Sequence, residues 1–446
     1  CRCRNRLRFG RKVNGGARWM RCSTVTEAMS SRERVLASIQ HRNPDRVPID
    51  LGATPSSGIS AIAYGKLKTH LGYNSGHTRI YDVVQYLAQP EGEMIDALGV
   101  DVLDIGRAFN TLDSDWYDIT MPDGNTGQYP VWFRPEKHAD GSWNAYHPDG
   151  TRIATMPQGA QFFDQTFFPW IDGYPDGHGG MNDSLDEAMD KVLWSHLAHS
   201  PWDHAGDEGF WETLRTRTKA LRESTDKALM VVCGCNLFEW GTFLRRMDNF
   251  LMDLYTDQGN VAVLMELLMD RHMKTLELVC ESVGDLVDVL RFGDDLGMDS
   301  GPFMGLDVYK ELFEAHRTRL CGYVHEHSGM ATFLHTCGSM YQYIPSLIDS
   351  GMDIINPVQT NCRDMDPVRL KSEFGKDIVF WGGGVDPREI LNRGTPQDVR
   401  DDVRRRLDIF APGGGYVFNN IHNILGEVPP ENIVALFEAV REYGTA

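Results

Sequence analysis

Short apolar runs alternate along the chain with longer stretches in which apolar residues recur every three or four positions. Most of the runs are rich in β-branched residues and end in Gly, Asp or Asn, which is typical of buried parallel strands. The runs occupy residues 47–51, 100–106, 228–234, 286–292, 331–337, 352–357, 378–382 and 416–421. The stretches with helical spacing occupy residues 30–41, 245–283, 307–327, 340–350, 396–410 and 431–442.

This alternation predicts an α/β protein, because parallel strands need helical connections between them. Eight such strands predict a (β/α)8 TIM barrel, and a doubly wound open sheet is the alternative. Residues 107–200 interrupt the pattern, since they are rich in Asp, Gly, Pro and aromatic residues and contain hairpin-like turns. We therefore expect a β-rich insertion between strands two and three, which either roofs an active site or only covers a helix.

The charge balance excludes several classes of partner. The chain has 44 Lys and Arg against 63 Asp and Glu, which gives a formal net charge of −19. A surface this acidic repels phosphate backbones and anionic lipids, so we expect neither nucleic acid nor a membrane surface as partner. No apolar run approaches the roughly 18 residues that a membrane-spanning helix needs.

The basic residues concentrate at the start of the sequence. Residues 1–26 hold eight Lys or Arg and no acid, so the other 420 residues carry 36 basic and 63 acidic groups, a net charge of −27. We interpret residues 1–28 as an unstructured leader or a stretch upstream of the natural start at Met29; an Arg-rich transit segment is the alternative. The cysteines beyond this leader lack the spacing of a secreted disulfide framework, so we expect a cytoplasmic protein.

Polar residues gather at the carboxyl ends of the predicted strands, where TIM barrels carry their catalytic groups. Asp294 and Asp295 follow the fourth strand, and we expect at least one to accept a proton or to ligate a metal. Capping of the following turn is the structural alternative for both. The candidate substrate-binding residues at the ends of later strands are Asn356, Gln359, Asp386 and Asn423.

His335 and Cys337 lie two residues apart on the fifth predicted strand, so their side chains point to the same face. Imidazole and thiolate together suit Zn²⁺, although the pair alone also fits a structural role beside the core. His422 follows the eighth strand, and closure of the barrel would bring it to the same mouth. Three protein ligands with an open fourth position are the pattern of catalytic zinc. Cys233 and Cys235 lack a second pair, and we expect them to be buried structural thiols.

Several short segments form a set that is specific to one superfamily. They are Arg32-Glu-Arg-Val-Leu36, Pro44-Asp-Arg-Val-Pro48, Gly293-Asp-Asp-Leu-Gly297, His335-Thr-Cys-Gly338, Gly394-Thr-Pro396 and Pro429-Pro-Glu-Asn-Ile433. With them the sequence resembles the uroporphyrinogen decarboxylase (URO-D) superfamily over about residues 30–446, and residues 107–200 match only loosely. The resemblance is closest to the corrinoid-linked, zinc-dependent methyltransferase branch.

In that branch zinc is held by the His and Cys of a His-X-Cys motif and by a second Cys just before a Thr-Pro-X-Glu-Asn stretch. The resemblance therefore implies zinc ligation by His335 and Cys337. His422, seven residues before Pro429, stands near the place of the second Cys. A histidine there removes one thiolate, which would suit polarising an ether or amine rather than activating a thiol.

The resemblance implies an enzyme that moves a methyl group between a small methylated substrate, a corrinoid protein and an acceptor. The corrinoid (cobalamin) would be supplied by a partner protein, because this sequence has no Asp-X-His-X-X-Gly motif. A homodimer follows from the resemblance alone.

Two other functions stay open. A decarboxylase-type lyase of tetrapyrrole biosynthesis binds a substrate with several carboxylates through an Arg-rich segment near the first strand. The matching residues 51–58 contain no arginine, which ranks this function second. A non-catalytic metal or ligand sensor would bind without turnover.

Overall fold

The centre of the molecule is a curled parallel sheet, seen in a computed structural model that describes residues 28–445. The leader predicted over residues 1–28 therefore lies, except for Ala28, outside the described residues. The strand order is β18-β17-β16-β15-β12-β11-β4. The strands are β4 (Val102–Asp104), β11 (Ala228–Gly234), β12 (Val289–Gly293), β15 (Ala331–His335), β16 (Ile354–Asn356), β17 (Val379–Trp381) and β18 (Tyr416–Val417). Each of them coincides with one of the predicted runs.

Residues 47–51 join the two edges of this sheet and take the place of the remaining predicted strand. Ile49 forms a parallel bridge with Phe418, just beyond β18. On its other side, the carbonyl of Ile49 accepts a hydrogen bond of 2.8 Å from the N–H of Asp101. Pro48 has no N–H to donate, so the segment makes a single bridge rather than a ladder. The predicted (β/α)8 architecture is confirmed, and the open doubly wound sheet was the wrong alternative.

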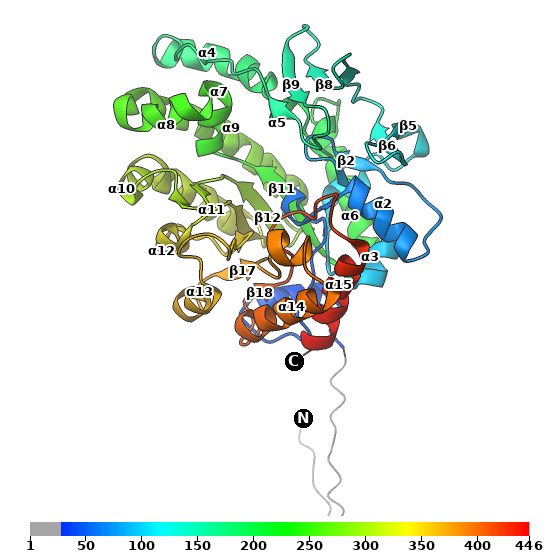
Figure 1. Cartoon of the computed structure of the whole chain (residues 1–446). Helices are drawn as coiled ribbons and strands as arrows, with labels where there is room; N and C mark the ends of the chain where they lie inside the picture. Colours follow the sequence, from blue (N-terminus) through cyan, green and yellow to red (C-terminus); the bar gives the residue numbers. More distant parts are fainter. Residues whose placement is uncertain (1–27, 446) are drawn as a thin grey trace, which may run out of the picture.

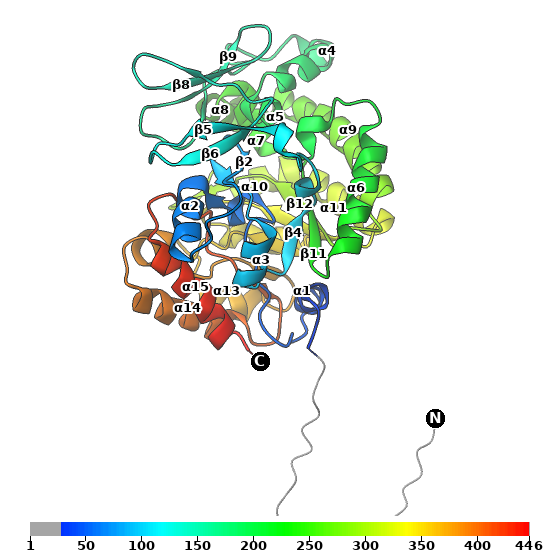
Figure 2. The same ribbon diagram turned by 90° about the vertical axis from the view of Figure 1, so that its right-hand side faces the viewer.

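Helices surround the sheet (Figure 1). The helix α1 (Ser31–Ile39) lies at the end of the barrel away from the insertion (Figure 2). Its Val35 packs into the inner core with residues such as Val102 and Val289. This helix covers the amino-terminal end of the barrel and leaves the carboxyl ends of the strands free for a site. The main outer helices are α2 (Ala61–His70), α3 (Gly92–Leu98), α6 (Phe210–Ser224), α11 (Ala315–His327), α12 (Ile344–Asp349), α13 (Pro367–Phe374), α14 (Pro396–Phe410) and α15 (Pro430–Tyr443).

The helical stretch predicted over residues 245–283 is divided. It comprises the end of α7 (Phe238–Arg245), α8 (Met247–Thr256) and α9 (Gln258–Val283). Helix α7 ends because Arg246 adopts a left-handed backbone conformation with φ of 67°, which apolar spacing does not reveal. Although α9 has 26 residues, no helix within residues 28–445 is long and apolar enough to cross a membrane.

The predicted β-rich insertion lies between β4 and β11, the second and third barrel strands, as expected. It contains a hairpin of β5 (Trp116–Thr120) and β6 (Thr126–Pro130). A four-stranded antiparallel sheet follows, made of β7 (Glu136–Lys137), β8 (Trp143–Tyr146), β9 (Arg152–Met156) and β10 (Asp164–Gln165). The helices α4 (Gly177–Asp190) and α5 (Leu193–His196) complete it. Together these elements lie over one end of the barrel (Figure 2).

Candidate functional site

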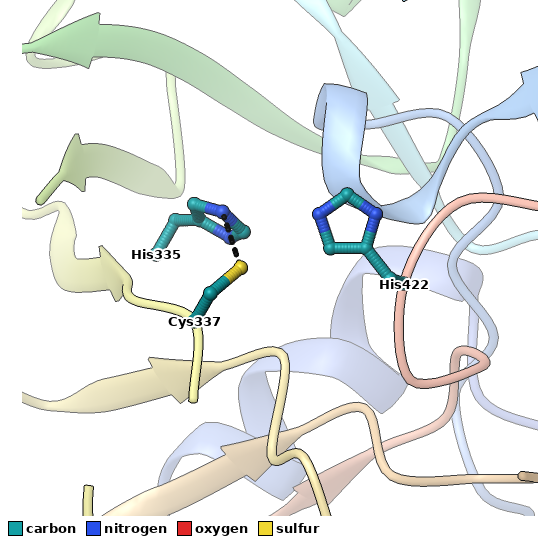
Figure 3. A group of neighbouring side chains, drawn as sticks. All are labelled: His335, Cys337 and His422. Atoms are coloured by element: carbon teal, nitrogen blue, oxygen red, sulfur yellow. Dashed lines mark hydrogen bonds between the residues drawn. The ribbon is translucent and has the colours of Figure 1, made fainter. Parts of the chain in front are cut away.

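Three potential metal ligands meet at the carboxyl ends of the barrel strands (Figure 3). His335 is the last residue of β15, and its Nε2 lies 3.6 Å from the Sγ of Cys337 in the turn that follows. His422 comes from the loop after β18. One ligand atom from each residue lies within 4.8 Å of the other two. The structure thus brings together the three residues that the sequence predicts as a zinc site.

Backbone contacts on both sides hold the His422 loop. Before His422, Phe418 forms a parallel bridge with Ile49. After His422, Ile424 forms a parallel bridge with Ile59. The turn after His335 is equally tight. A Cβ on Gly338, whose φ is 93°, would come within 2.3 Å of the backbone of Gly297, so this turn requires glycine.

Asn356 fixes the orientation of the His335 ring. Its Oδ1 lies 2.9 Å from His335 Nδ1, and its Nδ2 donates a hydrogen bond of 2.9 Å to the carbonyl of Trp381. Because the amide oxygen can only accept, Nδ1 carries the ring proton and the Nε2 lone pair faces Cys337. The sequence predicts Asn356 as a substrate-binding residue, whereas the structure places it behind a metal ligand, where such partners orient imidazoles.

Burial controls the protonation of these groups. It lowers the pKa of His335 to about 3, with a further contribution from the positive charge of Arg291, so the ring is neutral at neutral pH. Burial also lowers the pKa of His422. Conversely, burial and the nearby Asp295 raise the pKa of Cys337 well above its usual value. In the metal-free protein Cys337 is therefore a thiol, and a divalent cation would have to displace its proton.

A cavity of about 510 Å³ opens beside the cluster, and both His335 and His422 line it. This volume suits a small organic molecule. Part of its wall is aromatic, formed by Trp194, Trp202, Trp240 and Phe243. Trp194 belongs to α5, so the insertion contributes directly to the cavity that it covers.

The adjacent residues Asp294 and Asp295 have different surroundings. Asp294 is fully buried, lies 2.6 Å from Arg317, and accepts three backbone N–H groups at the start of α7. Asp295 lines the cavity, accepts the N–H of Cys337 at 2.8 Å, and lies 3.5 Å from His335 Nε2. Of the two predicted catalytic residues, Asp294 thus holds α7 in place and Asp295 faces the cavity.

The other predicted substrate-binding residues make contacts within loops. Gln359 accepts the N–H of Gly338, and Asp386 accepts two backbone N–H groups of the turn that follows it. Asn423 donates to Gln85 at 3.1 Å, and Gln85 lines the cavity. Among the cavity-lining residues that the structure describes, Gln359, Asp386 and Asn423 do not occur.

Three charged residues that the sequence analysis did not single out also line the cavity, namely Asp82, Arg291 of β12 and Glu239 of α7. Burial, followed by the charges of Asp295 and Asp294, raises the pKa of Glu239 to about 8. The sequence could have revealed that Arg291 faces the inside of the barrel. It follows the inward-facing Val289 by two residues on a strand, so the two side chains share a face. Cys233 and Cys235, expected to be buried thiols, reach the same wall with their sulfur atoms 3.6 Å apart.

A second group of potential ligands, which no sequence pattern predicts, occurs in the insertion. His147, Asp190 and His196 each bring one ligand atom within 4.8 Å of the others. His147 Nε2 lies 3.0 Å from Asp190, and His147 Nδ1 lies 2.9 Å from Asp149. Both ring nitrogens of His147 therefore already have carboxylate partners.

The sequence is similar to known uroporphyrinogen decarboxylases. The "Uroporphyrinogen decarboxylase (URO-D)" family model matches residues 216–443. The uroporphyrinogen decarboxylase of Methylococcus capsulatus is 30% identical over 105 residues, which are 24% of this chain and 28% of that protein. The enzyme of Chromohalobacter salexigens is 28% identical over 147 residues, 32% of this chain and 39% of that protein. The chain thus matches well under two thirds of these relatives' length.

A solved structure shares the fold over a much larger part of the chain. A methyltransferase from Methanosarcina mazei superposes with a TM-score of 0.55 at 15% identity, covering 93% of this chain and 99% of that one. Identity this low shows a common fold and nothing about the reaction. The family model, however, covers more than half of the 446 residues. The chain therefore belongs to the uroporphyrinogen decarboxylase family.

Proposed function

We propose that the protein is a zinc-dependent methyltransferase that moves a methyl group between a small methylated substrate, a corrinoid on a partner protein and an acceptor. The observation that carries this proposal is the cluster of His335, Cys337 and His422 beside the cavity. A structural zinc site is normally closed by four protein ligands, whereas three ligands beside a cavity leave a position for substrate.

The donor set fits zinc. Two imidazoles and one thiol are nitrogen and sulfur donors, which zinc prefers, and Asn356 already directs the lone pair of His335 toward the cluster. A zinc ion bound there would act as a Lewis acid on the heteroatom that carries the methyl group.

The residues of the chain supply the remaining requirements. When a methyl group leaves a heteroatom for the corrinoid, the heteroatom keeps the bonding electron pair and takes up a proton. Glu239 is protonated at neutral pH, because its pKa is raised to about 8, and it lines the same cavity. The aromatic wall offers an apolar surface to the body of a substrate. The six described cysteines beyond the leader are free thiols, which supports a reducing, cytoplasmic setting.

Decarboxylation of uroporphyrinogen is the second candidate, favoured by the names of the curated relatives. The cavity wall, however, has too few cationic side chains to bind the several carboxylates of uroporphyrinogen. Residues 51–58 have no arginine, and Arg291 is the one arginine among the described residues that line the cavity.

Corrinoid methylation tests the proposal. Free cob(I)alamin is mixed with methanol, methylamine or methoxybenzoate and with the zinc-loaded protein, and its absorbance spectrum reports methylation. We expect methylation with at least one donor, and none after the protein is treated with a chelator. Release of CO₂ from uroporphyrinogen that survives the chelator would favour the decarboxylase. Zinc binding without either activity would favour a sensor.

A further inference from the structure

Arg291 is a cation on the cavity wall that has no ion-pair partner among residues 28–445. Its Nε is buried and has no hydrogen-bond acceptor. Within residues 28–445, no carboxylate oxygen lies within 4 Å of its guanidinium nitrogens, which is the limit for an ion pair. Two other deeply placed arginines are paired with carboxylates, since Arg317 lies 2.6 Å from Asp294 and Arg245 lies 2.8 Å from Asp253.

The position of Arg291 directs its charge toward the candidate metal site. In the sheet, Gly293, two residues further on and on the same face, lies beside His335 of the neighbouring strand. An added Cβ on Gly293 would come 2.9 Å from the terminal nitrogen of Arg291. The guanidinium group therefore extends along β12 over Gly293, toward the level of His335. Glycine at this position leaves it the room.

An unpaired guanidinium in such a place has an energetic cost. Removing a charge from water is unfavourable unless an opposite charge or several hydrogen bonds replace the lost hydration. Glu239 offers little compensation, because its raised pKa of about 8 keeps it mostly neutral at neutral pH. Asp295 attracts the guanidinium only from beyond the 4 Å of an ion pair and makes no hydrogen bond to it. An anion that enters the cavity would supply both the missing charge and the missing acceptors.

We infer that Arg291 binds a carboxylate group of the substrate and so selects a small organic acid for this cavity. The planar guanidinium pairs with a carboxylate through two hydrogen bonds, and the aromatic wall suits the apolar body of such a molecule. A doubly charged phosphate fits less well, because Asp82 and Asp295 also line the cavity and repel a dianion more strongly.

The identity of this acid as the methylated substrate depends on the function proposed above, whereas the binding of the carboxylate does not. In a methylated acid held by Arg291, the carboxylate would anchor one end of the molecule. The methyl-bearing heteroatom would then be left free to face His335 and His422, which line the same cavity. Arg291 would thus be a specificity-determining residue.

Ligand binding to the full-length protein tests this inference by isothermal titration calorimetry with benzoate, its neutral isostere benzamide, and phenyl phosphate. We expect benzoate to bind at least about tenfold more tightly than benzamide, the range of a charge-assisted pair. Arg291→Gln should remove this preference while leaving benzamide binding unchanged, which also shows that the cavity is folded. Arg291→Lys should retain part of the preference. Arg393→Gln, at an exposed arginine, should retain all of it.

Three results would overturn the inference. Benzoate and benzamide could bind equally or not at all to the wild type, Arg291→Gln could keep the preference for benzoate, or phenyl phosphate could bind more tightly than benzoate. Measurement in the His422→Ala background separates the two proposals, because the preference should persist there even though the metal site is damaged. A preference that disappears in this background would assign the carboxylate to the metal instead of Arg291.

Discussion

Within residues 28–445, two clusters each combine two histidines with one further potential ligand, and they differ in what surrounds them. At the barrel mouth, His335 Nδ1 contacts the neutral amide of Asn356. Its Nε2 points toward Cys337 beside a cavity, and the nearest carboxylate, that of Asp295, lies 3.5 Å away. In the insertion, carboxylates contact both ring nitrogens of His147. One cluster thus presents an oriented lone pair, whereas the other already forms ion pairs.

These different partners also shift the pKa values of His335 and His147 in opposite directions. Burial lowers the pKa of His335 to about 3, so its ring is neutral and can ligate a metal. Partial burial opposes protonation of His147 as well, but the hydrogen bonds that its ring donates to Asp190 and Asp149 outweigh it and raise the pKa. A metal would have to compete with a proton at His147. Residue types within reach of one ion therefore do not suffice for a metal site, because their other partners decide whether the lone pairs are available.

The largest expected effect is on turnover. His335→Ala should lower the rate of corrinoid methylation roughly a thousandfold or more, since the Lewis acid contributes several kcal/mol to the reaction. The double variant His147→Ala/His196→Ala is the matched control and should stay within about twofold of wild type. Equal losses in both variants would abolish the distinction between the clusters.

A smaller effect should follow from the contact behind His335. Asn356→Leu removes the acceptor for Nδ1 and should weaken zinc binding by about 10- to 100-fold, as loss of such partners commonly does. Competition with a coloured zinc chelator measures the affinity. Asp386→Ala, at a residue that caps a turn outside the cavity wall, should leave the affinity unchanged. An unchanged affinity in Asn356→Leu would mean that the ring is oriented by packing alone.

Acid sensitivity should come from the buried histidines of the barrel. Burial lowers the pKa of His272 to about 4, so the folded state resists its protonation. Above about pH 6.5, the pKa of histidine in the unfolded chain, His272 is neutral in both states and does not change the free energy of unfolding. As the pH falls from there toward 4, only the unfolded state takes up the proton, so the folded state loses stability. Between pH 7.5 and 5 the loss is about 2 kcal/mol. Urea unfolding at both pH values should show that His272→Gln loses less stability than wild type on acidification; an identical loss would show that His272 does not titrate.

The smallest effect should have the opposite pH dependence. The raised pKa of His147 means that its ion pairs stabilise the fold below a pH of about 6.5 and that this stability is lost as the pH rises through the folded pKa. His147→Gln should therefore cost more stability at pH 5.5 than at pH 8.5. The cost should stay below about 1 kcal/mol, because Asp149 and Asp190 are 40% and 65% exposed. A larger cost at the higher pH would show that the ion pairs are not what His147 contributes.

The sequence sufficed for the barrel because its strands are buried on both faces and read as apolar runs. The His-X-Cys spacing also predicted that His335 and Cys337 lie together, although Cys337 is in the turn after β15 and not on the strand. Closure of the barrel accounted for His422. The role of Asn356 could not be read in the same way, since it depends on the register that pairs His335 with Asn356 across β15 and β16.

Two further features depend on contacts that no local pattern encodes. Asp294 and Asp295 are neighbours in sequence, and only the packing of Arg317 and the start of α7 shows that Asp294 is the structural one. The His147 cluster joins a hairpin to residues that follow it by more than 40 positions, within an insertion that lacks any regular period. Arg291, by contrast, was within reach, because its spacing from Val289 placed it on the inner face.

Zinc content measured by plasma mass spectrometry tests the central claim most directly. We expect about one zinc per wild-type chain, the same content in His147→Ala/His196→Ala, and almost none in Cys337→Ala or His422→Ala. Zinc near zero in the wild type, zinc unchanged in both barrel variants, or zinc lost from the insertion variant would contradict it.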